Sequence, residues 1–272
     1  METLNTSKLT LGALAVRLLF GLAMSFTILW SFGVPELPKF QQPELARILF
    51  WHLPCPIIAS VLLGVGAYQS WQYLRSNDLK RDVKAIAALE LGMIFSLMTM
   101  ASGIVFSRAQ WGAWWQNDPR QTSFLLVLMI YFAYFVLRGA FQDRMRKAAL
   151  SAGYALAAVL PAMFLIYVFP YLPQIKEASL HPTGSIMSGQ IRGSYAQALT
   201  ATITLVSLCS IWLFRLRVRA GELELKTYES IGLETSGGHS AAHRVVRPVR
   251  ISAPGGIQGS EGAGASDGAG QP

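Results

Sequence analysis

Two of the chain's four histidines lie beside apolar segments, where an imidazole is unusual. His52 stands in RILFWHLPCPI and His181 in EASLHPTGSIM, whereas the other two belong to a Gly-rich C-terminal region. Ionisable side chains at membrane depth are costly and are usually functional, and a neutral imidazole is a common ligand of iron. Pro54 and Pro56 interrupt helical hydrogen bonding after His52, so a bent helix could turn this imidazole inward. The pair is a candidate ligand set, with satisfied interfacial histidines as the alternative.

Three of the seven tryptophans stand within five residues, in the segment SRAQWGAWWQNDPRQTS. If the segment is helical, the spacing of Trp111, Trp114 and Trp115 puts the three rings on one face. Because Gly112 and Ala113 add little bulk between them, the rings would form a flat platform on which a planar, apolar ligand stacks. An aromatic belt at the membrane–water interface is an equally good interpretation.

The same segment carries a helix-start pattern. Asp118 fits an N-cap, Pro119 the first helical position and Gln121 the third, which together predict a capping box. A rigid corner at Asp118 would hold the tryptophans in place.

Composition indicates an integral membrane protein with an all-α fold. Of 272 residues, 52% are apolar and 14% charged, against the ~25% charged residues usual for soluble domains, and the mean hydropathy is +0.38. These values exclude disorder, collagen and coiled coil for most of the chain. A six-helix transmembrane bundle is predicted, because six segments are long and apolar enough to span a bilayer; they lie near residues 11–32, 48–74, 84–107, 122–138, 147–171 and 194–214.

The charge distribution predicts the orientation of this bundle. The net charge is +8, and the segments next to the predicted spans carry twelve basic residues on the side that holds both termini and six on the other side. The positive-inside rule therefore puts both termini in the cytoplasm and the loops 33–47, 108–121 and 172–193 outside. A basic excess of this kind does not indicate nucleic-acid binding. We expect a transmembrane domain over residues 1–214 and a mostly disordered, Gly-rich cytoplasmic tail over 215–272.

Glu90 is an acidic residue inside the third apolar segment. We interpret it as snorkelling to the cytoplasmic surface, where Lys84 or Arg17 is the expected partner.

The segment WGAWWQNDPRQTS resembles the tryptophan-rich WWD motif of haem-handling proteins in cytochrome c maturation. Its Arg and its TS ending are most similar to the CcmC family, whose motif approximates WGxWWxWDxRxTS. The sequences His52-Leu53-Pro54 and Leu180-His181-Pro182 fall where that family has its two histidines. The resemblance covers residues ~10–215.

This resemblance implies that the protein holds haem b at the outer face of the cytoplasmic (inner) membrane and passes it to a haem chaperone of the CcmE type. It further implies CcmA, CcmB and CcmD as associated components, and no catalytic residues. The axial ligands would be His52 and His181. The platform positions would be Trp111, Trp114, Trp115, Asp118 and Arg120. Arg108 and Arg120 flank the platform and could pair with the haem propionates, although interfacial snorkelling is as good an interpretation.

Asn117 departs from the family pattern, since it stands where the motif usually has a third Trp. The contact with haem there is weaker, or this is a divergent branch with a different recipient. Two alternatives to a haem exporter remain open at this point. One is a haem-b subunit of a membrane electron-transfer complex, and the other is a CcsA-type cytochrome c synthase component.

Overall fold

The computed structural model describes residues 11–37, 42–181 and 191–242, with only the helix backbone described for 231–242. The chain divides into two compact units, residues 1–227 and 228–272. In the part of the chain so described, all regular structure is helical, and six helical stretches are long and apolar enough to cross a membrane. This confirms the predicted all-α fold with six spans.

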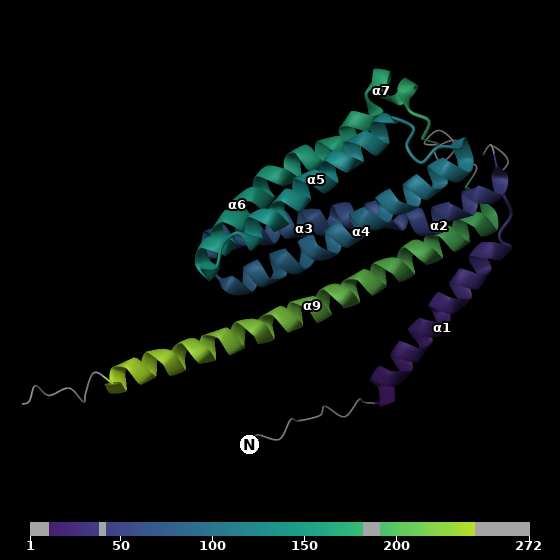
Figure 1. Ribbon diagram of the computed structural model, residues 1–272. Coiled ribbons are helices and arrows are strands. Elements are labelled where there is room, and N and C mark those ends of the chain that lie inside the picture. The colour runs from purple at the N-terminus through teal and green to yellow at the C-terminus, as the bar shows by residue number, and fades with distance from the viewer. Residues whose placement is uncertain (1–10, 38–41, 182–190, 243–272) are drawn as a thin grey trace, which may run out of the picture. The chain divides into compact units, whose positions relative to one another are not determined.

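The described residues form the following helical elements (Figure 1). They are α1 (Leu11–Gly33), η1 (Pro43–Ile48), α2 (Leu49–His52), α3 (Pro54–Ser76), α4 (Leu79–Trp111), α5 (Pro119–Gly139), α6 (Arg144–Met163), η2 (Phe164–Val168), η3 (Phe169–Tyr171), α7 (Pro173–Ala178) and α9 (Gly193–Ala242). The predicted boundary at residue 214 falls inside α9, which continues as one helix. Residues 243–272, the Gly-rich part of the predicted tail, lie outside the described residues.

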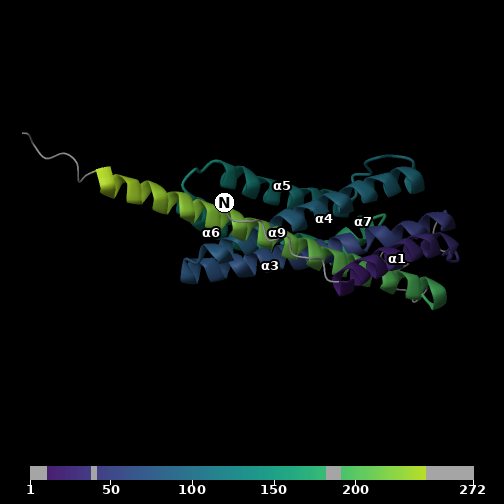
Figure 2. The same cartoon turned by 90° about the horizontal axis from the view of Figure 1, so that it is seen from below.

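Helices α3, α4, α5 and α6 lie alongside one another, as both views show (Figures 1 and 2). Helices α3 and α4 approach each other closely at two glycines. A Cβ on Gly66 would lie 2.4 Å from Leu89 Cδ2, and one on Gly92 would lie 2.9 Å from Leu63 Cδ2. Each leucine therefore occupies the space that a side chain would need on the opposite helix, which fixes the register of α4 against α3.

Two ion pairs tie α4 to its neighbours. Arg138 on α5 donates two hydrogen bonds to the Asp82 carboxylate, at 2.8 and 2.7 Å. Arg217 on α9 does the same to Glu90, at 2.6 and 3.1 Å. Sequence reasoning was therefore wrong about the partner of Glu90, because the residue that reaches it is 127 positions away on another helix.

The first part of α9 packs against the N-terminal half of the chain. Tyr195 donates a hydrogen bond to the Ala46 carbonyl at 2.7 Å, and its ring lies 4.6 Å from that of Phe50. Burial of these rings holds η1 and α2 in position, and α2 carries His52.

Candidate functional site

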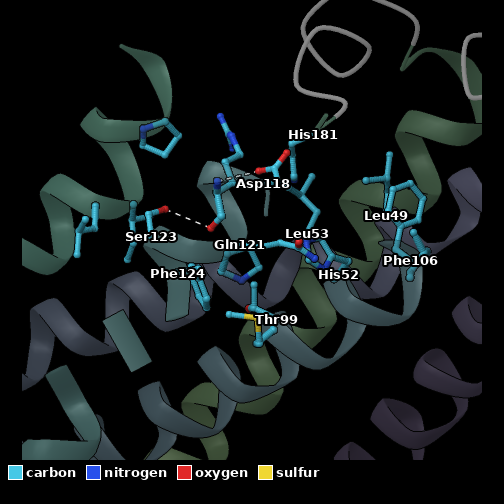
Figure 3. Close-up of a pocket in the computed structure, with 18 of the residues that line it drawn as sticks. Leu49, His52, Leu53, Thr99, Phe106, Asp118, Gln121, Ser123, Phe124 and His181 are labelled. Atoms are coloured by element: carbon cyan, nitrogen blue, oxygen red, sulfur yellow. Dashed lines mark hydrogen bonds between the residues drawn. The ribbon is translucent and has the colours of Figure 1, made fainter. Parts of the chain in front are cut away.

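One cavity lies where η1, α2, the last turns of α4, the start of α5 and the segment after α7 come together (Figure 3). Its atom-free volume is about 1130 Å³, including the open side. Most of its walls are apolar, from Ile48, Leu49, Leu53, Met100, Phe106, Phe124, Leu165 and Ile166. Both candidate ligands, His52 and His181, line it, although they are 129 positions apart in the sequence. The cavity thus combines apolar walls with two imidazoles.

His52 is the last residue of α2, and its ring faces α4. The ring Nδ1 lies 2.8 Å from Ser102 Oγ. The predicted interruption after His52 is milder than a break. Leu53 keeps helical dihedrals (φ −62°, ψ −38°), and its N–H still donates to Leu49 O at 3.0 Å. The proline at position 54 therefore removes a donor from the ladder while the chain continues in a helical direction.

His181 lies just beyond α7, in an irregular segment. Burial of the ring, the positive charge of Arg120 and the nearness of His52 lower the pKa of His181 to about 3, against the opposing effect of Asp118. The ring is therefore neutral at physiological pH. A neutral imidazole has an unprotonated nitrogen, which is the state required for binding a metal.

Asp118 connects the two segments on which the site depends. The side chain is only 4% exposed, and its Oδ1 accepts the backbone N–H of Arg120 at 2.7 Å, so it is the N-cap of α5. Ser179 Oγ lies 3.1 and 3.0 Å from its two oxygens, and the Leu180 N–H donates to Oδ2 at 2.6 Å. The carboxylate thereby holds the residues immediately before His181.

The predicted N-cap is confirmed, but the reciprocal half of the capping box is not seen. Gln121 Oε1 accepts the backbone N–H of Gln116 at 3.1 Å, so this side chain braces the preceding loop.

The tryptophans do not share one helical face, because α4 ends at Trp111. Gly112 has a φ of +84° and caps the helix in the left-handed conformation. Trp111 lines the cavity, with its ring edge-to-face to Phe106 at 5.3 Å. Trp114 and Trp115 follow on irregular backbone, are 59% and 37% exposed, and are not among the lining residues. Stacking of a ligand on these two rings stays a prediction.

The two arginines occupy different places. Arg120 lines the cavity, with its guanidinium 5.0 Å from the centre of the Tyr171 ring. Arg108 is exposed, donates to the Gly112 carbonyl and lies 6.0 Å from the Trp114 ring. Only Arg120 is therefore placed to meet an acidic group of a ligand in the cavity.

Comparison with known proteins identifies the family of the chain. Residues 4–229 match the family model described as CcmC, heme exporter protein C. The chain belongs to this family. It is 28% identical to heme exporter protein C of Paracoccus denitrificans (strain Pd 1222) over 43% of this chain and 47% of the relative. The Bradyrhizobium diazoefficiens relative is 30% identical over 52% and 55%, and that of Escherichia coli (strain K12) is 28% identical over 72% and 82%. The chain thus spans about half the length of the first two relatives and most of the third.

Asn117, the position that departs from the CcmC motif, has a φ of +53°. Asn adopts this left-handed conformation far more readily than a bulky residue. The substitution therefore accompanies a left-handed backbone conformation directly before the Asp118 N-cap.

Sequence reasoning missed Ser102 and Ser179. Serines are common in membrane helices and in loops, so neither carries a sequence signal. Their roles depend on partners 50 and 61 residues away.

Proposed function

We propose that this CcmC-family protein binds haem b at the outer face of the cytoplasmic membrane and passes it to a haem chaperone of the CcmE type. The observation that carries the proposal is the pair His52 and His181 at one apolar cavity, with the His181 ring held neutral. Two imidazoles can fill both axial positions of a haem iron. The relatives' name, heme exporter protein C, supports the same cargo.

The other residues that line the cavity suit the porphyrin ring and the propionates of haem. A porphyrin is large, planar and mostly apolar, and Leu49, Leu53, Phe106 and Trp111 provide surfaces of that kind. Its propionates are acidic, and the Arg120 fork suits a carboxylate. The exposed rings of Trp114 and Trp115 lie on the loop between α4 and α5. We infer that they contact the part of the macrocycle that projects from the cavity.

The proposed transfer role rests on the different ways in which His52 and His181 are held. His52 belongs to a helical stretch packed into the bundle, whereas His181 lies in an irregular segment to which Asp118 bonds at Ser179 and Leu180. We infer that His52 anchors the iron and that His181 is displaced when the chaperone supplies its own ligand. This is a binding and transfer role, with no chemical conversion of the haem. Partners of the CcmA, CcmB and CcmD types and the lipid bilayer complete the proposed assembly.

One histidine pair favours this function over a subunit of an electron-transfer complex. Such subunits often hold two haems and need four histidines within the spans. The described spans contain His52, and His181 stands just outside them, at the same end.

The test compares haem content and optical spectrum in purified wild type, His52→Ala and His181→Ala, each with and without imidazole. We expect a six-coordinate, low-spin spectrum in the wild type. His52→Ala should lose more haem than His181→Ala, and imidazole should restore the sixth ligand in His181→Ala. His239→Ala, in the predicted tail, is the matched histidine control. Unchanged, six-coordinate haem in both cavity variants would refute the ligand assignment. Equal and complete loss would refute only the anchoring difference.

The proposed orientation has its own test. Single cysteines introduced at exposed positions of the 108–121 loop should react with impermeant reagents added from outside the cytoplasmic membrane. Labelling only after the cytoplasmic side is opened would place the cavity on the wrong side for this function.

A further inference from the structure

The His52 ring lies against one short stretch of α4. Its Nδ1 is 2.8 Å from Ser102 Oγ, and its Cε1 is 3.5 Å from where a Cβ of Gly103 would stand. The contact joins residues 50 positions apart. A side chain at position 103 would therefore come into van der Waals contact with this edge of the ring. Ser102 is therefore the polar group that bonds to Nδ1 of the His52 ring.

The hydrogen bonds of Ser102 decide which partner donates. A serine hydroxyl has one proton and can accept two further bonds. Ser102 Oγ lies 2.7 Å from the carbonyl of Met98 and 3.2 Å from that of Thr99, so its proton is used within the helix. The hydroxyl can then meet His52 only as an acceptor. Nδ1 must therefore carry the proton of the neutral ring.

We propose that Ser102 is a positioning residue that holds His52 as the Nδ1–H tautomer and so reserves Nε2 for a metal in the cavity. The identity of that metal, haem iron, rests on the proposed function; the tautomer is a property of the protein without haem. An acceptor on the second nitrogen of a ligating histidine fixes the orientation of the ring and raises its basicity. Ser102 supplies that acceptor from a different helix, one that Gly66 and Gly92 lock against α3.

The two histidines are consequently held in different ways. Ser102 bonds to the ring of His52 itself, whereas Asp118 bonds to the residues preceding His181. A change at Ser102 should therefore alter the electronic state of one imidazole while leaving the backbone around both histidines in place.

The test uses ¹⁵N-histidine-labelled, haem-free protein in nanodiscs. The His52 signals are identified by their absence from His52→Gln. We expect a protonated Nδ1 and an unprotonated Nε2 in the wild type, a mixture of tautomers in Ser102→Ala, and the wild-type pattern in Ser102→Thr, which keeps the hydroxyl. A protonated Nε2 in the wild type, or no change in Ser102→Ala, would overturn the proposal.

Ser96→Ala is the matched control. Ser96 is buried on the same helix. Its hydroxyl donates to the carbonyl four residues earlier, Gly92 O, at 2.8 Å, just as Ser102 donates to Met98 O, but it makes no hydrogen bond to His52. In haem-loaded protein, Ser102→Ala should lower haem retention roughly 2- to 10-fold, as expected for one lost hydrogen bond. It should also raise the reduction potential, because a less basic imidazole stabilises ferric iron less well. Ser96→Ala should do neither.

The outcomes separate this inference from the proposed function. If the wild type binds no haem, the proposed function fails, and the ¹⁵N spectrum still decides the tautomer. If it binds haem while Nε2 is protonated in the haem-free protein, only the role of Ser102 fails. Equal losses of haem in Ser102→Ala and Ser96→Ala, with an unchanged reduction potential, would reduce Ser102 to a packing residue.

Discussion

Asp118→Asn should loosen the His181 segment while leaving α5 capped. Asn and Asp are about equally good N-caps, so the new side-chain oxygen can keep the bond from Arg120 N at the Oδ1 position. The amide nitrogen then replaces Oδ2. It faces the Leu180 N–H, which now donates to Oδ2 at 2.6 Å, and two donors cannot bond to each other. The bond that holds the residue before His181 is lost.

The magnitude follows from the burial of the carboxylate. A buried donor left without an acceptor costs about 1–3 kcal/mol. Ser179 can still donate to the remaining oxygen, so we take about 2 kcal/mol, or roughly 30-fold in an equilibrium constant. If His181 must be docked to ligate haem, haem should dissociate from Asp118→Asn up to about 30-fold faster. Ser179→Ala, which keeps the Leu180 bond, should have a smaller effect.

The assay is the transfer rate of bound haem to an excess of apomyoglobin, measured by absorbance in nanodiscs. Asp143→Asn is the matched control, because Asp143 caps α6 through Arg146 N at 2.7 Å but is exposed and holds no distant segment. Dissociation from Asp118→Asn no faster than from Asp143→Asn would refute the argument that Asp118 positions His181.

Three further changes have effects that the structure predicts. Because the pKa of folded His181 is lowered to about 3 from its ordinary 6.5, the unfolded segment binds the proton more readily. Docking of the segment should therefore be strongest above pH 6.5 and weaken by about 1.4 kcal/mol per unit as pH falls toward 3. His181→Gln should reduce the increase in backbone hydrogen exchange that acid causes in the segment carrying His181. An unchanged dependence of that exchange on pH would contradict this prediction. Asn117→Trp should lower haem retention although it restores the motif, because a bulky residue at φ +53° costs about 1–3 kcal/mol, whereas Asn117→Gly should be tolerated. Higher haem retention in the Trp variant would show that the backbone at position 117 adapts to the larger side chain. Gly66→Ala should lower the thermal unfolding temperature, since its Cβ would lie 2.4 Å from Leu89, while Gly64→Ala, with nothing within 4 Å, should not. Equal melting of the two glycine variants would contradict the close-packing argument.

The spans and the cap were predictable because they depend on neighbours in sequence. Long apolar runs must form helices in a bilayer, where loose backbone groups find no partner, and all six predicted segments are helical in the structure. Asp118 followed by Pro119 is a local helix-start signal, and Asp118 does cap α5. The family motif likewise pointed to His52 and His181, and both line the cavity.

The arrangement of the site was decided only by tertiary packing. Nothing near Glu90 in the sequence indicates Arg217, nothing near His52 indicates Ser102, and nothing near Asp118 indicates Leu180. The end of α4 at Gly112 likewise removed the helical face that the tryptophan spacing suggested. A contact between residues 50 to 127 positions apart depends on the register in which whole helices pack. Close-fitting pairs such as Gly66 and Leu89 set that register, and hydropathy and spacing along the chain carry no information about it.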